Sequence, residues 1–388
     1  RVVIADGAMG TMLQDQKPTL EDFLGQEGCN EVLNRTRPDI VSSVHDAYFE
    51  AGVDCVETNT FGANWSNLSD YGIEDRIEEL ALAGAQVARQ VADDFSTDEK
   101  PRYVLGSVGP GTKLPSLGHE KFSVLRDAYQ KQTVGLLNGG VDAILIETAQ
   151  DLLQAKSAVI GAKRAMKTLD VYVPIIVSVT IETTGTMLLG SEIGAALTAL
   201  SALGIDSIGL NCATGPTEMS EHLRYLSKYS NLPVTVMPNA GLPILGPHGA
   251  HYPLSPVELA TAQLQFVNDY GAGLVGGNES RADVAEIRAH RLRGKDRAAT
   301  RDRAGQRDQP AEPLTDFLHQ GEGRQRAGVT ASPGCHRDKA GCALFDRLAG
   351  EAVVDDIVHR HAAPVAHGGV YILARAQRGD DHWHLPFL

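Results

Sequence analysis

Eight short apolar runs recur along the first 277 residues, and each is followed by a longer segment whose apolar residues have helical spacing. The runs are rich in β-branched and aliphatic residues, and each ends in a small or polar residue. They span residues 2–5, 53–58, 103–107, 143–148, 175–180, 207–211, 234–237 and 272–275. A chain that alternates in this way forms a parallel sheet whose faces are covered by helices.

Eight strand-and-helix units over about 250 residues are typical of an α/β protein with a (β/α)8 TIM barrel. A doubly wound open sheet is the alternative, because alternation alone does not show that a sheet closes. Four of the runs are introduced by similar phrases, AGVDCVET, GGVDAILIET, LGIDSIGLN and YGAGLVGG. In each, we expect a glycine to end the preceding helix in a left-handed conformation.

The intervening segments are amphipathic. In residues 77–95, Leu80, Leu82, Ala85, Val87 and Val91 are spaced for one helical face. The segment 152–166 is the second clear case. Both are predicted to cover the sheet.

The composition changes near residue 277. Residues 1–277 contain nine Arg and nine Lys, whereas residues 278–388 contain 15 Arg and two Lys, together with eight of the 13 His. We therefore predict a barrel over residues 1–277, with a last helix at 282–292, and an atypical Arg- and His-rich tail over residues 293–388. The order of this tail is left open.

Charge and hydropathy exclude several classes of function. The formal net charge is −14, which argues against a nucleic-acid or anionic-membrane surface. No apolar run approaches the ~20 residues of a membrane helix, and no signal segment is recognisable. Five scattered cysteines do not suggest a disulfide framework. These features predict a cytoplasmic protein, and the first residue, Arg1, predicts a fragment or a processed chain.

Active sites of barrels form where the strands end, so the polar residues at those points are informative. Asp6 ends the first run, Glu147 the fourth, and Asn211 and Cys212 follow the sixth. Either carboxylate could accept hydrogen bonds from an ammonium group, or simply cap the next helix. The backbone amides of Gly7 and Gly10, at the start of a helix, could bind an anion.

Cys212 opens towards the same end, where a thiolate can be a nucleophile or a metal ligand. The alternative is a small buried apolar side chain. A nucleophile would need a base, and only His248 and His251, in the loop after the seventh run, could reach such a place. Cys55, within a run, and Cys29 are expected to be structural.

Seven sequence blocks together resemble the homocysteine S-methyltransferase family, in particular the homocysteine-binding domain of cobalamin-dependent methionine synthases. The resemblance covers residues 1–277 nearly continuously, and the wider family includes betaine- and S-methylmethionine-dependent enzymes. The blocks are DGAMGTMLQ (6–14), EGCNEVLNRTRPDIVSSVH (27–45), AGVDCVETNTFGAN (51–64), GSVGPGTKLPSLG (106–118), ETTGTMLLGSEIGAALTAL (182–200), GLNCATGP (209–216) and MPNAGLP (237–243).

The resemblance implies a barrel that transfers a methyl group to homocysteine, giving methionine. In the family, three cysteine thiolates hold a zinc ion, and the substrate sulfur takes the fourth position as a thiolate. Cys212 matches the first of those ligands, and Asn211 is placed to support the metal side. Asp6 and Glu147 match the residues that bind the substrate ammonium group, and backbone amides such as that of Gly7 would hold its carboxylate.

The chain departs from the family after Gly277. The other two zinc ligands are an adjacent cysteine pair at this point, but here Asn278, Glu279 and Ser280 follow. The zinc site is therefore expected to be impaired. We hypothesise that residues 278–388 are an out-of-frame translation, the alternatives being a genuine extension or replacement ligands from Cys335, Cys342 or tail histidines.

The resemblance also sets expectations for partners. Methylcobalamin would act as methyl donor only through separate domains, since the folate- and cobalamin-binding modules of the family cannot fit in 111 residues. Two alternatives stay open: a stand-alone methyltransferase that uses S-methylmethionine, and a barrel remnant without catalysis.

Overall fold

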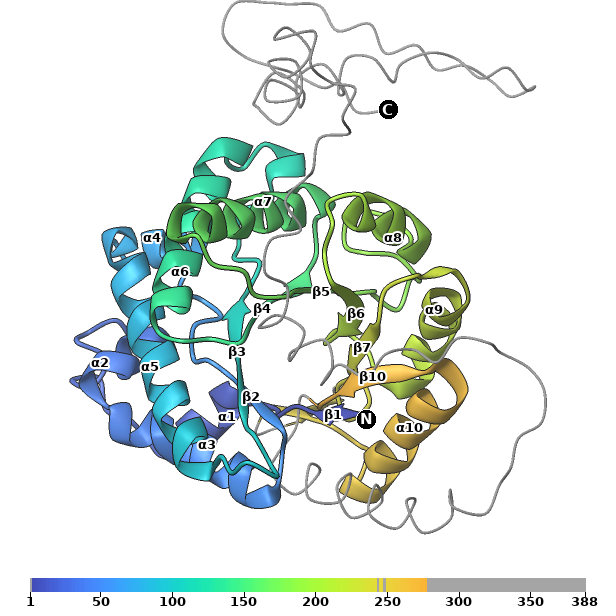
Figure 1. Ribbon diagram of the computed structural model, residues 1–388, viewed down its shortest axis with the longest axis horizontal. Coiled ribbons are helices and arrows are strands. Elements are labelled where there is room, and N and C mark those ends of the chain that lie inside the picture. Colours follow the sequence, from blue (N-terminus) through green and yellow to red (C-terminus); the bar gives the residue numbers. More distant parts are fainter. Residues whose placement is uncertain (1, 243, 247–248, 278–388) are drawn as a thin grey trace, which may run out of the picture. The chain divides into compact units, whose positions relative to one another are not determined.

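In the computed structural model, eight parallel strands form one sheet in the order β1-β10-β7-β6-β5-β4-β3-β2 (Figure 1). The structure describes residues 2–242, 244–246 and 249–277. The expectations for the helix at 282–292, for the tail and for Cys335 and Cys342 therefore lie outside the described residues. The strands are β1 (Val3–Ile4), β2 (Cys55–Glu57), β3 (Tyr103–Val108), β4 (Ala143–Ala149), β5 (Ile175–Val179), β6 (Ser207–Asn211), β7 (Val234–Met237) and β10 (Ala272–Val275).

The two edges of this sheet meet at β1. On one side, β1 pairs with β10, and Ala5 N donates to Val275 O at 2.9 Å. On the other side, Ala5 forms a parallel bridge with Cys55 of β2, and Asp6 N donates to Cys55 O at 3.1 Å. The sheet therefore closes into the predicted (β/α)8 barrel, and the open-sheet alternative is excluded.

Helices surround this ring on the outside (Figure 1). Most strands are followed by one long helix, as the alternating pattern predicts, and short 3-10 turns extend several connections. The α-helices are α1 (Met9–Asp15), α2 (Leu33–Thr36), α3 (Pro38–Ala51), α4 (Trp65–Asp70), α5 (Ile77–Phe95), α6 (Phe122–Asn138), α7 (Leu152–Leu169), α8 (Ile193–Ser201), α9 (Pro216–Tyr229) and α10 (Pro256–Tyr270). The 3-10 turns are η1 (Asn30–Val32), η2 (Glu74–Arg76) and η3 (Pro115–Leu117).

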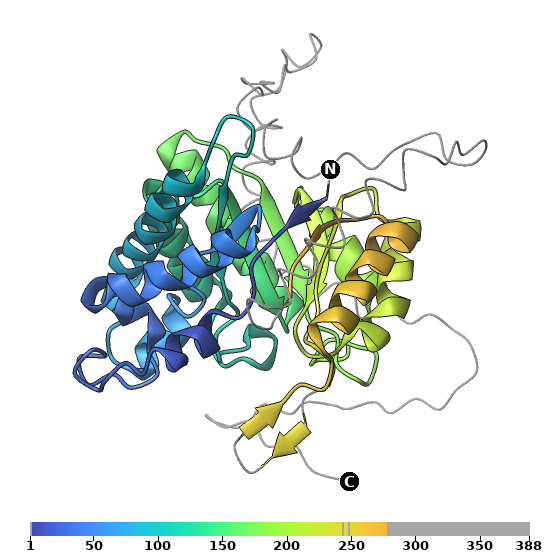
Figure 2. The ribbon, with the colours of Figure 1, turned by 90° about the horizontal axis from the view of Figure 1, so that it is seen from below.

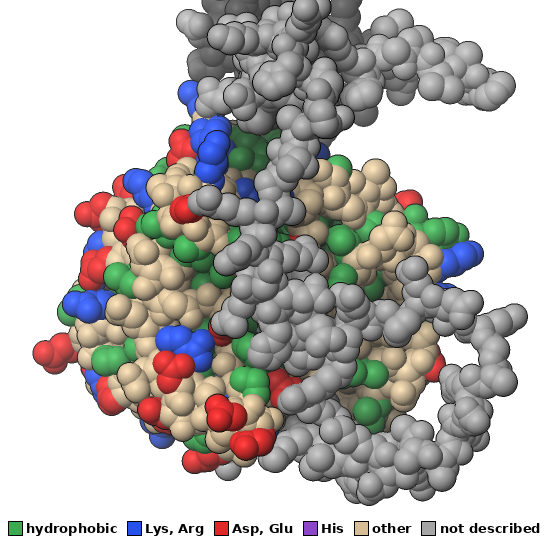
Figure 3. Space-filling view, in the orientation of Figure 1, with side chains coloured by type: hydrophobic (Ala, Val, Ile, Leu, Met, Phe, Trp, Pro, Cys, Tyr) green, Lys and Arg blue, Asp and Glu red, His purple; other side chains and the backbone are tan. Residues whose placement is uncertain are grey.

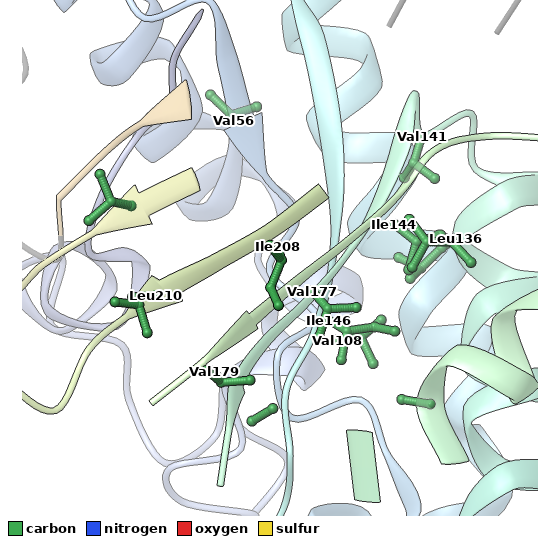
Figure 4. Close-up of a cluster of buried hydrophobic side chains, with 14 of the residues drawn as sticks. Val56, Val108, Leu136, Val141, Ile144, Ile146, Val177, Val179, Ile208 and Leu210 are labelled. Carbon is green, nitrogen blue, oxygen red and sulfur yellow. The ribbon is translucent and has the colours of Figure 1, made fainter. Parts of the chain in front are cut away.

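The main hydrophobic core lies between the strands and the helices (Figure 4). Alternate strand residues such as Val56, Ile144 and Val177 face the helices and are fully buried. Burying one such side chain contributes about 1.5–3 kcal/mol. The other strand positions face the barrel interior, where a second cluster includes Leu105 and Leu145. This alternation decides which strand-end residues point into the barrel.

Helix α5 largely follows its predicted face. Leu80, Ala85 and Val91 are buried, whereas Leu82 and Val87 are only half-buried because they lie at the edge of the apolar stripe. The expected glycine conformation is confirmed in all four repeated phrases, since Gly52, Gly140, Gly204 and Gly271 have positive φ.

The aspartate of three of these phrases has a shared structural role that the sequence did not reveal. Asp54 accepts a hydrogen bond from Ile4 N at 3.0 Å, and Asp142 accepts one from Val104 N at 2.7 Å. Asp206 does the same for Ile175 N at 2.9 Å. Each aspartate thus binds the first or second residue of a neighbouring strand.

A hairpin interrupts the connection between β7 and α10. Its strands, β8 (Ile244–Gly246) and β9 (Gly249–His251), pair antiparallel and stand away from the ring in Figure 2. His251 was expected in a loop, and this expectation is wrong, because its backbone pairs with Ile244. His248 lies outside the described residues.

The face of the barrel shown in Figure 3 carries charged side chains of both signs. Acidic and basic side chains are interspersed over the helices on the face shown in Figure 3. Within the described part of the chain, no helix combines the length and the apolar character that a bilayer crossing requires.

The burial of His45 on α3 is expected to make the fold sensitive to acid. This histidine is fully buried, neither ring nitrogen has a hydrogen-bond partner among the described residues, and burial lowers its pKa from 6.5 to about 4. Between these values the unfolded chain binds a proton that the folded protein does not. We expect protonation of His45 to lower the free energy of unfolding by about 3 kcal/mol as the pH falls from 7 to 4. In His45→Leu this contribution to the pH dependence should be absent. Urea unfolding of both proteins at several pH values tests this, and equal pH dependence would contradict it.

Candidate functional site

Four strands carry polar side chains into the barrel at their carboxyl ends. Glu57 of β2, Ser107 of β3, Glu147 of β4 and Asn211 of β6 occupy the inward-facing phase of their strands, as Cys55, Leu105 and Leu145 do further down. Asp6 follows β1 directly. These residues therefore meet at one end of the barrel, where the sequence predicted a site.

Asp6 is fixed by the backbone of the neighbouring strand. It is buried, and both carboxylate oxygens accept a hydrogen bond from Glu57 N, at 3.1 and 3.0 Å. Burial raises the pKa of Asp6 well above its usual value, and the charge of Glu147 adds to this, while the backbone hydrogen bonds act in the opposite direction. A buried carboxylate of this kind gains from a cationic ligand.

Glu147 is held by two neutral side chains. Its Oε1 accepts from Ser107 Oγ at 2.5 Å, and its Oε2 accepts from Asn211 Nδ2 at 3.3 Å. Burial raises its pKa to about 7, against the lowering effect of its hydrogen bonds with Ser107 and Glu57. Glu147 therefore changes charge near neutral pH.

Glu57 is the third carboxyl group of the cluster, and it was not among the predicted site residues. It shares a side-chain hydrogen bond with Glu147, and burial followed by the charges of Glu147 and Asp6 raises its pKa well above 4.5. The signal that could have found it is its phase, because Glu57 lies two residues beyond Cys55 on a strand whose inward positions alternate.

Asn211 joins the carboxyl cluster to the thiol of Cys212. Besides Glu147, its Nδ2 contacts Thr148 Oγ1 at 2.8 Å and Cys212 Sγ at 3.4 Å. Its Oδ1 accepts a hydrogen bond from Thr148 N at 2.8 Å. The side chain of Asn211 is therefore fixed in position by several contacts.

Cys212 lies where the chain leaves β6 in a left-handed conformation. Its φ is 55°, that of Ala213 is 57° and that of Thr148 is 54°. Residues other than glycine rarely adopt such values. The Thr148 hydroxyl donates to Sγ at 3.7 Å, and Cys212 N donates to Met237 O at 3.1 Å. Burial, and then the charge of Glu147, raise the pKa of Cys212 to about 12. The sulfur thus lies among polar groups at the same end as Asp6 and Glu147.

The end of β10 completes this side of the ring. Gly277 N donates to Asp6 O at 3.4 Å, and a Cβ at Gly276 would lie 3.0 Å from the same oxygen. From α10, Gln263 donates to Gly276 O. The chain therefore leaves the described region beside Asp6, with Gly7 leading into α1 on the other side.

The described residues do not fit a catalytic zinc ion. Such a site takes three protein ligands, and soft thiolates are preferred. Cys29 and Cys55 are buried outside this cluster, which leaves Cys212 as its sulfur donor. Over residues 2–242, 244–246 and 249–277, no group of three or more His, Cys, Asp or Glu side chains is placed to hold a metal ion.

Comparison with known proteins places the barrel among methyltransferases. Residues 3–290 match the family model described as homocysteine S-methyltransferase. The chain is 56% identical over 321 residues to the methionine synthase of Mycobacterium leprae, covering 82% of this chain and 26% of that protein. It is 60% identical over 291 residues to the methionine synthase of Mycobacterium tuberculosis, covering 74% and 24%. The chain thus spans about a quarter of the length of these relatives.

Solved structures agree on the fold. The homocysteine methyltransferase MmuM from Escherichia coli, in its metallated form, superposes with a TM-score of 0.61 at 20% identity, covering 74% of this chain and 96% of that one. Its apo form gives a TM-score of 0.57. At this identity the likeness concerns the barrel itself.

Proposed function

Because the chain belongs to the homocysteine S-methyltransferase family, we propose that its barrel binds homocysteine and presents the substrate sulfur for methylation to methionine. The observation that carries this proposal is the cluster formed by the buried Asp6 and Glu147 with the half-buried Glu57, which Asn211 links to the sulfur of Cys212. An amino acid thiol has the matching chemistry, with a cation at one end and a sulfur at the other.

Each end of the substrate has its own proposed contacts. Glu147 and Asp6 accept hydrogen bonds from the ammonium group, whose charge offsets the cost of burying them. Backbone N–H groups around Gly7 bind the carboxylate. Asn211 keeps Glu147 and the Cys212 sulfur at a fixed separation, so the ammonium and the substrate sulfur are aligned together.

Methyl transfer needs a nucleophilic sulfur, and in the family zinc supplies this by binding the thiolate. The donors of the described residues do not make up a site for that ion. We propose that methylcobalamin, carried by a separate module together with the folate-binding part, is the methyl source, as the resemblance of the sequence blocks to cobalamin-dependent methionine synthases implies. The chain's own residues bind and orient the acceptor.

The incomplete donor set favours one second candidate, a barrel that binds homocysteine without methylating it. Asp6, Glu57 and Glu147 do not depend on a metal for their positions, since backbone and side-chain contacts of the barrel fix them. Amino acid recognition would therefore persist where sulfur activation is lost. Both candidates share the same binding step.

That binding step gives a direct test. L-homocysteine and 4-mercaptobutyrate, which lacks the ammonium group, are titrated into the protein by calorimetry at pH 8, with and without a chelator. We expect homocysteine to bind about a hundredfold more tightly than the analogue, because a buried carboxylate left unpaired costs several kcal/mol. We also expect the chelator to leave this ratio unchanged. Equal affinities would refute the proposed role of the carboxyl cluster.

A further inference from the structure

The three carboxyl groups of the site outnumber the charges that a homocysteine ammonium can offset. Asp6, Glu57 and Glu147 lie close enough that each affects the pKa of another. At the inward-facing positions of the described strands there is no Lys, Arg or His. Three neighbouring carboxylates without a cation repel one another, and this repulsion favours a proton on one of them.

The hydrogen bonds distinguish the three groups. Asp6 accepts the Glu57 N–H with both oxygens, and Glu147 accepts from Ser107 and Asn211. Donors of this kind favour the ionised form. The side chain of Glu57 faces Glu147 instead, and one proton must lie between two carboxyl oxygens that share a hydrogen bond.

We propose that Glu57 is a positioning residue that holds a proton at neutral pH and donates its carboxylic O–H to Glu147. This inference rests on the proposed function only for its effect on homocysteine, because the shared proton is a property of the ligand-free barrel. At pH 8 the bond leaves Glu147 ionised and fixed, with its remaining acceptor capacity directed to the ammonium group. The site then presents two negative charges in place of three.

The direction of the pKa shifts agrees with this assignment. Every influence on Glu57 raises its pKa, beginning with burial, whereas the hydrogen bond from Glu57 lowers the pKa of Glu147. The other titratable groups that act with Glu57 are Asp6, Cys55 and Cys212. Both thiols are neutral at pH 7, because burial raises the pKa of each.

Glutamine is the natural probe, because it resembles a protonated glutamate in shape and still donates a hydrogen bond. We expect Glu57→Gln to keep homocysteine affinity within about threefold at pH 8, and Glu57→Leu to weaken it by about tenfold or more, because Glu147 loses its donor. Glu192→Gln, an exposed acid of similar size, is the matched control. If Glu57 were ionised and contacted the ammonium directly, Glu57→Gln would lose as much affinity as Glu147→Gln.

A second measurement needs no ligand. Infrared difference spectroscopy at pH 8 should show the C=O stretch of a protonated carboxylic acid in the wild-type protein, and Glu57→Gln should remove it. Absence of that band, or its persistence in Glu57→Gln, would overturn the inference. If the band behaves as expected but homocysteine does not bind, the proposed function fails and the protonation of Glu57 stands.

Discussion

Glu147→Gln is expected to weaken homocysteine binding by about a hundredfold at pH 8 while making the ligand-free barrel more stable. Glutamine keeps the contacts with Ser107 and Asn211 within reach but provides no charge for the ammonium group. Loss of one partner of a buried, hydrogen-bonded charge pair costs about 2–5 kcal/mol. The same change removes a buried anion beside Asp6, so repulsion within the empty site falls.

The pH dependence separates these two effects. The folded-state pKa of Glu147, about 7, lies above the ordinary value of 4.5, so the folded protein binds the proton more tightly than the unfolded chain. The proton bound by Glu147 therefore contributes fully to the free energy of unfolding at low pH. This contribution is lost as the pH rises through 7. We expect Glu147→Gln to be more stable than wild type at pH 8 but not at pH 4. Homocysteine binding to wild type should weaken below pH 7, as Glu147 becomes neutral.

Calorimetric titration and urea unfolding, each at pH 4, 6 and 8 where binding is measurable, provide both readouts. Glu192→Gln again serves as the control, because its exposed side chain lies at the start of α8. Unchanged homocysteine affinity in Glu147→Gln would show that the ammonium lies elsewhere.

Gly209→Ala is expected to be the most damaging single methyl addition to the described barrel. Gly209 lies in the middle of β6, and a Cβ there would lie 1.9 Å from Thr235 Oγ1 and 2.3 Å from Thr235 O of β7. The backbone oxygen is part of the sheet and cannot rotate away, so the two strands must separate. Overpacking ordinarily costs about 1–3 kcal/mol, and we expect about 3 kcal/mol or more here.

Gly273→Ala provides the matched control for this change. Gly273 is also a strand glycine of the barrel, in β10, but its nearest contact to an added Cβ is Val234 O at 3.9 Å. We expect it to leave the free energy of unfolding within about 1 kcal/mol of wild type. Equal urea midpoints for the two variants would contradict the packing argument.

The sequence predicted the barrel because eight contiguous aliphatic runs alternate with helical segments, whereas closure is shown by the pairing of β1 with β10 and of Ala5 with Cys55. All eight predicted runs overlap the observed strands. The hairpin of β8 and β9 was missed, since its segment contains glycine and proline and lacks a clear alternation. A local sequence pattern does not predict a strand pairing that depends on a few backbone hydrogen bonds.

The candidate site was predictable only in part, for a related reason. Asp6, Glu147, Asn211 and Cys212 stand at strand ends, where the sequence alone marks them as polar residues after apolar runs, and the structure brings them to one end. Their proposed roles stay predictions. Glu57 and Ser107 stand at the ends of their runs as well, but they were not among the predicted site residues. Their inclusion depends on which face of the strand turns inward, and that is set by ring closure.

The closure of the barrel at β1 connects the fold with the candidate site. This strand is two residues long, yet it joins β10 to β2 and carries Asp6 directly behind it. A substitution that weakens the pairing of β1 therefore also displaces the Asp6 carboxylate from the ammonium group that it is proposed to bind. Affinity for an amino acid therefore reports whether the barrel is closed. A bound ligand would in turn stabilise the closed barrel against opening at β1.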